Sequence, residues 1–553
     1  STVGSGGGDV SVSGTGGGSG TSAFNAGVSI SSAGAGITSG GNGNVSVIGT
    51  GGSGSGGRQY GVWLQSAGGI TASGMGTVTV EGTGGASSGV NNFGVNVSDA
   101  NSKITSSGGA VSVTGRGGGG MGAGNFGLVL GNSGAISSGG NADITLTTDS
   151  HVGDGSESIN AGTGTVTIRN RSAGTLVNLG GADVLSGSPL TLGLSSAELN
   201  RITAGQVIVG RNDASASGNI TVSSAVSPTG AANVTLLTGG DIAINAGLGA
   251  TTQLTLTAGN GSSVSGSGNI TAPNLLLNGP NVNYTLNTAA GNSVGTLAAA
   301  NAAGLAFANG GALTIGSVNG VNGISASGPV SVATAAGNLS LSQPVNTTDN
   351  SASAIALNAG QSTAAGTSTG GDIVVSGAGA VSTGAGGRAT LMTGSVAGST
   401  GVAALAGGSG SGHYRYHSDE STTHYTSALG AGTYVVYREA PTLAVTVNND
   451  SKTYDATAYS GGNGYTATGM LNGDSAASAS PTTYGGTAQG AKNANTYTLT
   501  AGGDSPLGYL INATNGTLTI DKADLAITTG NVTKTYDGGT VAVGSAVATG
   551  GTS

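Results

Sequence analysis

The sequence predicts an all-β protein: a right-handed parallel β-helix with three strands per coil, followed by small β-rich repeat domains. The first observation behind this prediction is a strand-like pattern, Asp9–Gly17. Copies of this pattern begin again at Asn44, Thr77 and Ala110. Units that repeat at a fixed period and cannot bury their apolar side alone must stack on one another. Stacked parallel strands bury a continuous ribbon of like residues, which is the geometry of a parallel β-helix.

Each repeat contains two further apolar segments, and this gives three short strands per unit. A second apolar alternation follows each first strand, and a single isoleucine then precedes a Ser/Gly turn. The alternating pairs are Val28/Ile30, Val62/Leu64, Val95/Val97 and Leu128/Leu130, and the isoleucines are Ile37, Ile70, Ile104 and Ile136. Because alternate side chains of a strand point to opposite faces, we expect these residues to line the interior of the coils.

The composition is that of a folded chain built from small residues. It has 113 Gly among 553 residues, 7% charged residues and no Cys, yet 36% of the residues are apolar, which argues against a disordered chain. A collagen triple helix is excluded, because a Gly-X-Y period is missing and only nine Pro occur.

The charge pattern excludes two classes of partner. The net charge is −9, and the 14 Lys and Arg residues are scattered singly, so no basic stripe is available to neutralise phosphate groups. No apolar run approaches the roughly 20 residues that a membrane helix requires. We therefore expect no nucleic-acid partner and no membrane insertion.

The β-helix is predicted to have two sections. Residues 1–150 form long coils of about 33 residues with Gly-rich loops, such as Gly49–Gln59 and Gly115–Asn125, which we expect to line one edge as flexible ridges. Residues 151–410 form shorter, irregular coils. Within them, Ser195–Thr203 is predicted to form a short turn, and the Ala-rich Leu297–Phe307 is predicted to form an ordinary coil face.

The carboxyl-terminal part contains a different repeat. Residues 411–440 are predicted to form a cap and linker, residues 441–523 a small β domain, and residues 524–553 the start of a truncated second copy. The motif Lys-Thr-Tyr-Asp at 452–455 returns at 534–537, 82 positions later. Because this second copy is incomplete, we expect the natural chain to continue.

Two segments resemble a known family. Leu192–Gly205, followed by Val207–Gly210 and Gly218–Val222, is similar to a segment of filamentous-haemagglutinin-like exoproteins of Gram-negative bacteria. The Lys-Thr-Tyr-Asp repeat resembles the MBG/YDG-type β modules that follow such β-helices. The resemblance covers most of residues 160–553, and the family's amino-terminal secretion domain is missing from this sequence.

The resemblance implies a large bacterial adhesin that is secreted by a two-partner route. The expected protein is a structural exoprotein at the cell surface, where a long β-rod mediates attachment or aggregation through a host or neighbouring-cell receptor or glycan. An outer-membrane secretion partner is implied by the family alone. The alternative is a subunit of an extracellular filament or sheath whose function is polymerisation, because open β edges are templates for strand addition.

A polysaccharide-active enzyme is the remote alternative. Glycoside hydrolysis needs paired carboxylates about 5 to 9.5 Å apart, so acids should recur on neighbouring coils. Asp9, Glu81, Asp99 and Asp143 do not align in this way. We therefore predict no catalytic residues, no enzyme activity and no cofactor.

One histidine-rich segment offers weak metal candidates. His413, His417 and Asp419, or Glu420 in place of Asp419, have side chains that bind zinc. The spacing of the two histidines suits a helix better than a strand, and Arg415 between them is unfavourable. The favoured interpretation is therefore a structural cap without metal.

Trp63, the only tryptophan, is a weak candidate for ligand binding. Alternation places Val62 and Leu64 inward, so Trp63 should lie on the outer face, where an indole could stack on a sugar. Large apolar groups are usually covered, and covering by a neighbouring loop or protomer is the favoured alternative.

The segment 408–440 is expected to close the last coil. Its first bulky residues, Tyr414, Tyr416, Val435 and Val436, are the natural lid. His413, Arg415 and His417 are expected to face outward. Glu439–Pro441 is predicted to be the hinge into the small domain, because a residue before proline is held extended.

Overall fold

The computed structural model describes residues 1–119, 122–288, 291–481 and 483–550. The chain is nearly all β, with 43% of residues in strands and 2% in helices, and most strands are parallel. It divides into two compact units. The first unit comprises Ser1–Gln361 with Ile373–Ala389, and the second comprises Ser362–Asp372 with Thr390–Ser553. Among the described residues, no helix has the length and apolar character needed to cross a membrane.

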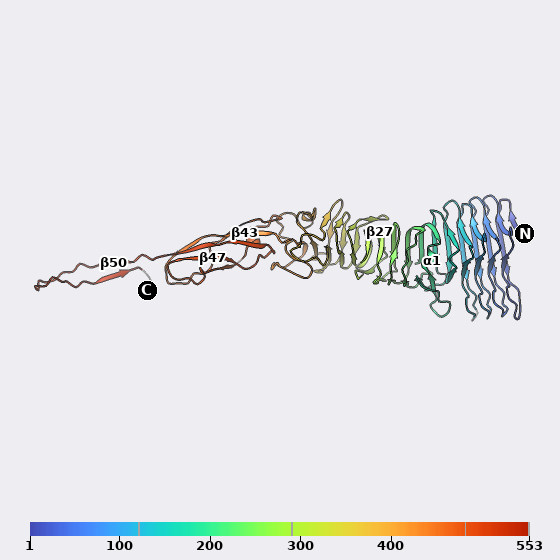
Figure 1. The fold of residues 1–553 in the computed structure, drawn as a ribbon, viewed down its shortest axis with the longest axis horizontal. Coiled ribbons are helices and arrows are strands. Elements are labelled where there is room, and N and C mark those ends of the chain that lie inside the picture. The colour runs from blue at the N-terminus through green and yellow to red at the C-terminus, as the bar shows by residue number, and fades with distance from the viewer. Residues whose placement is uncertain (120–121, 289–290, 482, 551–553) are drawn as a thin grey trace. The chain divides into compact units, whose positions relative to one another are not determined.

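The first unit begins with a column of five parallel strands in register (Figure 1). They are β2 (Val10–Thr15), β5 (Val45–Thr50), β8 (Val78–Thr83), β11 (Val111–Arg116) and β14 (Ile144–Thr148). Val10 lies opposite Val45, Val45 opposite Val78 and Val78 opposite Val111, and all four are buried. The predicted stacking of these repeats, like residue on like residue, is therefore confirmed.

Two further columns complete each coil. One is a five-stranded sheet of β3 (Val28–Ile30), β6 (Val62–Leu64), β9 (Val95–Ser98), β12 (Leu128–Gly131) and β15 (His151–Gly153). The other contains β1 (Thr2–Ser5), β4 (Gly36–Ser39), β7 (Gly69–Ala72), β10 (Lys103–Ser106), β13 (Ala135–Ser138) and β16 (Ser158–Asn160). The predicted inward residues of both columns are buried and in register. This arrangement is compatible with a parallel β-helix.

Paired glycines form a narrow neck where each long loop leaves the coil. A Cβ added at Gly82 would overlap the carbonyl group of Gly94, and the same overlap is found between Gly115 and Gly127. The outgoing and returning segments of the loop therefore approach each other at a distance that excludes a side chain.

The loops beyond the neck are linked by a polar ladder. The backbone N–H of Gln59 donates to Oδ1 of Asn92, and the N–H of Asn92 donates to Oδ1 of Asn125, each over 2.9 Å. Asn25 donates in the same way to Oε1 of Gln59. The loops predicted to be flexible ridges are therefore held in register by side chains, with residues 120 and 121 of the last loop outside the described residues.

The coils become shorter after β14. Ile144 lies opposite Val166, and Ile220, Ile242 and Val264 lie opposite one another in turn, so these steps span 22 positions instead of 33. Sequence inspection had found only irregular spacing here. The strands carrying these residues are β14, β17 (Thr165–Arg169), β21 (Ile220–Val222), β23 (Ile242–Ile244) and β26 (Ser263–Ser265).

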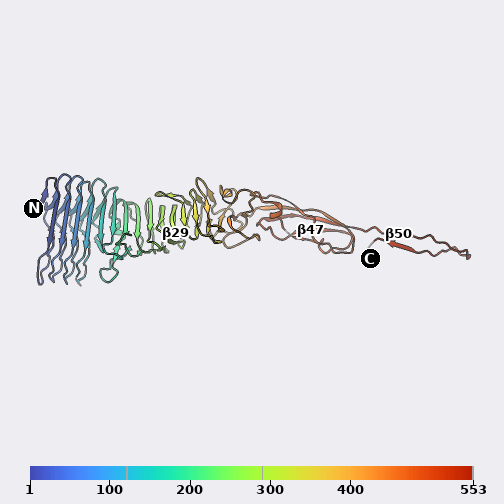
Figure 2. The same cartoon turned by 180° about the vertical axis from the view of Figure 1, so that it is seen from behind.

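Parallel pairing continues through the shorter coils (Figure 2). The longer strands are β20 (Ile202–Arg211), β22 (Ala231–Thr238), β25 (Gln253–Thr257), β27 (Ile270–Asn278), β29 (Ser293–Asn309), β34 (Val330–Thr334) and β37 (Ile355–Ala359). The Ala-rich segment lies in β29, so it forms a strand with parallel neighbours, which is compatible with the predicted coil face. The predicted turn near residue 195 is a single helical turn, α1 (Ser196–Leu199).

The second unit contains a small β domain and a preceding cap segment. Its three-stranded sheet has β43 (Thr442–Val447) between β45 (Tyr465–Thr468) and β48 (Leu510–Thr514). Its four-stranded sheet has the order β44 (Asp450–Thr453), β49 (Gly516–Asp521), β47 (Thr496–Gly502) and β46 (Thr483–Gly485). The cap contains α2 (Val402–Leu405), β41 (Tyr414–Arg415) and β42 (Gly432–Tyr437), and α3 (Ala476–Ala479) belongs to the small domain.

The cap is fastened to the small domain through a buried carboxylate. Asp474 accepts hydrogen bonds from the hydroxyl groups of Tyr416 and Tyr509, each over 2.8 Å. The carbonyl of Glu439 accepts from the N–H of His417, and the carbonyl of Pro441 accepts from Leu510. Both ends of the predicted hinge at 439–441 are therefore hydrogen-bonded within the second unit, and its role as a hinge stays a prediction.

The second copy of the repeat begins with the same strand pairing as the first. Strands β50 (Ala526–Thr529) and β51 (Ala546–Thr549) are antiparallel, with Ile527 opposite Ala548, as Val445 is opposite Ala467 in the first copy. The motif lysines make equivalent ion pairs, Lys452 with Asp455 and Lys534 with Asp537, over 2.6 and 2.7 Å. The motif therefore builds the same local turn in both copies.

Candidate functional site

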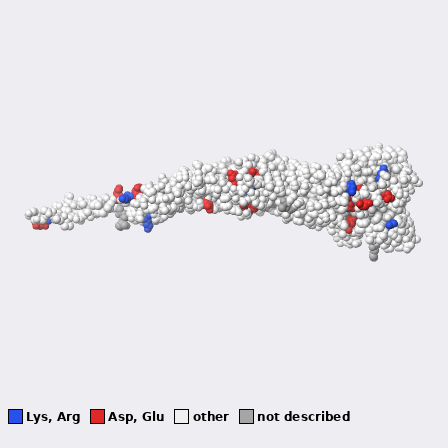
Figure 3. All heavy atoms as spheres, in the orientation of Figure 1, with Lys and Arg blue, Asp and Glu red and all other residues white. Residues whose placement is uncertain are grey.

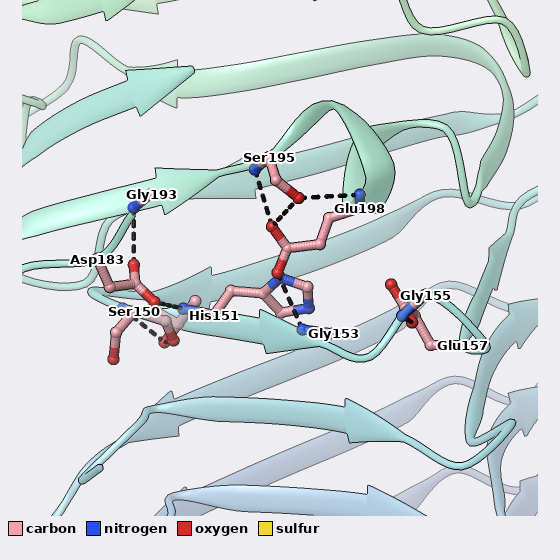
Figure 4. A network of polar contacts seen from close by, with 10 residues as sticks. Ser150, His151, Gly153, Gly155, Glu157, Asp183, Gly193, Ser195 and Glu198 are labelled. Carbon is pink, nitrogen blue, oxygen red and sulfur yellow. Dashed lines mark hydrogen bonds and ion pairs between the residues drawn. The ribbon is translucent and has the colours of Figure 1, made fainter. Parts of the chain in front are cut away.

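A group of largely buried titratable side chains lies where the five-stranded sheet ends at β15 (Figure 4). A strand at the edge of a sheet leaves backbone N–H groups without a neighbouring strand. Here the N–H of His151 donates to Oδ2 of Asp183 over 3.0 Å, and the N–H of Gly153 donates to Oε1 of Glu198 over 2.9 Å. Two carboxylates thus take the place of the next strand, and we call this group the carboxylate seam.

Glu198 is held in place by the local structure of α1. Its Oε2 accepts hydrogen bonds from the N–H and the hydroxyl of Ser195 over 2.8 and 2.7 Å, and its own N–H donates to the Ser195 hydroxyl. This reciprocal arrangement is a capping box. The His151 imidazole Nδ1 lies 3.3 Å from Oε1 of the same carboxylate.

Asp183 links two strands that do not pair directly. While its Oδ2 accepts from His151 on β15, its Oδ1 accepts from the N–H of Gly193 over 2.7 Å. Gly193 lies on β19 (Thr191–Leu194), which pairs with β18 (Leu176–Leu179) on its other side. The aspartate carboxylate therefore bridges β15, the last strand of the five-stranded sheet, to β19.

The two carboxylates have opposite pKa shifts. Burial raises the pKa of Asp183 to about 7, against the lowering effect of the N–H of Gly193 and of His151. Burial would also raise the pKa of Glu198, but the neighbouring His151 imidazole and the hydrogen bonds of Ser195 outweigh it and lower that pKa to about 2. At neutral pH Glu198 is ionised, and Asp183 titrates.

The seam contains serine, histidine and carboxylates without the geometry of nucleophilic catalysis. A serine nucleophile must be hydrogen-bonded to its histidine base, whereas the Ser195 hydroxyl donates to Glu198. The His151 side chain is 3% exposed, so its ring is closed to a substrate. The arrangement supports a structural role, in which the carboxylates end one sheet and hold the next coils.

The opposite shifts predict a stability optimum for the seam at about pH 4, between the ordinary pKa values of the two carboxyl groups. Because the pKa of Asp183 is higher in the folded chain than its ordinary 3.8, its stabilising contribution is lost as pH rises through about 7. Because the pKa of Glu198 is lowered from 4.5, its contribution is lost as pH falls through about 2. The free energy of local opening at 151–153 should fall by about 2 kcal/mol between pH 5 and pH 8.

Amide hydrogen exchange of residues 151–153, corrected for the intrinsic rate at each pH, measures this opening. The Asp183→Asn variant provides the comparison, since it cannot titrate at this position. An equal decline in both proteins between pH 5 and pH 8 would assign the effect to another group.

The structure places Trp63 among aromatic side chains. Val62 and Leu64 are fully buried, and Trp63 between them is partly buried on the opposite side of β6. Its ring centroid lies 5.1 Å from that of Tyr60 and 6.1 Å from that of Phe24, both from the loops. These rings cover part of the indole, and a sugar-stacking role for Trp63 stays a prediction.

The histidine-rich segment is not assembled as one ligand set. His413 packs on Tyr434 with ring centroids 4.5 Å apart, whereas His417 stacks on His424 at 3.8 Å. The Asp419 carboxylate accepts hydrogen bonds from the backbone N–H groups of Ala365, Ser421 and Thr422. Within the described ranges, no group of three or more His, Cys, Asp or Glu side chains is placed to hold a metal ion.

Arg415 is a correction to the predicted cap. It was expected to face outward with the histidines, but it is buried, at 4% exposure. Its guanidinium donates to the carbonyl groups of Gly412, Tyr414, Ser427 and Ala428, so hydrogen bonds replace its contact with water. The four lid residues are also buried within the second unit, and their covering of the last coil stays a prediction.

Sequence inspection missed the seam, although two signals were present. Ser195 and Glu198 have the spacing of a capping box. His151 lies opposite Leu128, so it occupies a position that is apolar in the coils before it. A polar residue in an apolar column marks the place where the column ends.

Comparisons of the chain with protein-family models, with curated proteins and with solved structures found no match.

Proposed function

We propose that this chain is part of a secreted structural exoprotein displayed at a bacterial cell surface, an adhesin that mediates attachment or aggregation. In this proposal, the two predicted sections, residues 1–150 and 151–410, form one right-handed, three-faced β-helix that serves as a spacer and scaffold. The main support is the in-register stacking of three strand columns, coil after coil, around an apolar interior. Such a stack provides length and stiffness with few specialised residues.

Surface chemistry supports contact along a length of protein instead of catalysis at one point. Charged residues are sparse on the face drawn in Figure 3, where uncharged atoms cover most of the surface. Many weak contacts along a repetitive surface reinforce one another, because each later contact is intramolecular. The partner in this proposal is a receptor or glycan on a host or neighbouring cell, and export would use an outer-membrane secretion partner.

Bead attachment tests the proposal. Beads coated with the chain should adhere to target cells, and beads coated with a protein lacking residues 1–160 should adhere less. Equal adhesion of the two would count against a role of the first coils in attachment.

Electron microscopy of the purified chain distinguishes an adhesin from the alternative, a filament subunit. Ordered fibres with a regular subunit repeat would favour a filament subunit.

A further inference from the structure

One column of backbone N–H groups in the long loops ends without an acceptor. Gly16, Gly51 and Gly84 each donate to a carbonyl oxygen of the next coil, over 2.7, 2.8 and 2.8 Å. Gly117 is the fourth member of this column. Among the described residues its N–H has no acceptor, because the next coil has no corresponding loop and passes from β14 directly into β15.

A cavity of about 210 Å³ lies at this step, and Gly117 lines it. Its other walls include Arg116 and Arg171, with Leu185 and Leu190 as apolar contacts. Neither arginine forms an ion pair with any carboxylate in the part of the chain that the structure describes. The cavity therefore combines a free backbone donor with two cationic donors and an apolar wall.

The one acidic residue of the cavity is already occupied. Asp149 accepts hydrogen bonds from the N–H groups of Arg171 and Ser172, from the Ser172 hydroxyl and from the Thr175 hydroxyl. Four donors stabilise its charge within the protein, so the two guanidinium groups remain available for a ligand.

We propose that this cavity binds a carboxylate carried on a single sugar ring, as in a sugar acid of an acidic glycan. Arginine and backbone N–H groups suit a carboxylate, and the two leucines suit the apolar face of a ring. The volume is below that of pockets for drug-sized ligands and matches one small unit. The choice of a sugar as the carrier rests on the proposed attachment function.

Titration calorimetry of the full chain with glucuronate tests this inference. We expect a dissociation constant on the order of 1 mM, typical of a small ligand with few contacts. Arg171→Gln and Arg116→Gln should each weaken binding about tenfold, because each removes a charged donor. Arg58→Gln is the matched control, since Arg58 is exposed on an earlier loop and does not line the cavity.

Three further probes identify the chemistry. Glucose should not bind, and acetate should bind about tenfold more weakly than glucuronate, because it lacks the ring that meets Leu185 and Leu190. The inference would be overturned if glucuronate did not bind or if glucose bound equally well. It would also be overturned if Arg58→Gln and Arg171→Gln lost the same amount of glucuronate affinity. Tighter binding of a triglutamate peptide would overturn it in favour of a peptide site.

The outcome is separable from that of the proposed function. Glucuronate binding measures the cavity alone, whereas bead attachment measures the whole surface. Beads that adhere without any glucuronate binding would overturn the cavity inference and leave attachment standing. Glucuronate binding by a protein whose beads fail to adhere would support the cavity and contradict attachment.

Discussion

Replacing Gly82 by alanine should destabilise the first coils by about 3 kcal/mol or more. The added Cβ would overlap the backbone carbonyl of Gly94, and neither backbone can move without disturbing the strands above and below. The overlap involves rigid backbone on both sides of the neck, so rotation of a side chain cannot relieve it. The loss should therefore exceed that of an ordinary surface substitution.

Trp63 provides a local probe for this measurement, because it is the only tryptophan and lies on β6, which pairs with β9, the strand that follows Gly94. Urea unfolding followed by its fluorescence should show a lower midpoint for Gly82→Ala. Gly17→Ala is the control, since a Cβ at Gly17 meets no atom within 4 Å. Its midpoint should change little, within about 1 kcal/mol of stability. Equal midpoints for the two variants would show that the neck tolerates a side chain.

Replacing Glu198 by alanine should open the carboxylate seam, with a local loss of about 2 to 3 kcal/mol. The change leaves the N–H groups of Gly153 and Ser195 without acceptors and removes the anion beside His151. It also removes one half of the capping box that begins α1. Amide exchange at residues 151–153 should accelerate accordingly, while exchange in the column of β5 and β8 stays unchanged.

Two further variants define the cause. Glu198→Gln retains one acceptor oxygen and should lose less than Glu198→Ala. Glu81→Ala removes a carboxylate from an exposed position on β8 and should leave exchange at the seam unaltered. Faster exchange at 151–153 in Glu81→Ala, or none in Glu198→Ala, would contradict the role assigned to the seam.

The columns of the first unit were predictable because their signal is local and repeated. Val45, Val78 and Val111 recur at one period, and a register error of one residue would turn every inward side chain outward. The small β domain was predictable for the same reason, since its motif returns 82 positions later with the same strand pairing. The 22-residue step was missed because the spacing between successive stacked strands varies from one face of the shorter coils to another.

The sequence by itself determined which residues line the interior and which repeats stack, because alternation and period are properties of neighbouring residues. Tertiary structure alone decided where the columns stop and what closes them. His151 meets Asp183 across 32 positions, and Gly153 meets Glu198 across 45. The free N–H of Gly117 likewise exists only because the next coil lacks a loop. Contacts of this kind depend on how the chain fills the end of a sheet, where the repeat no longer dictates the next neighbour.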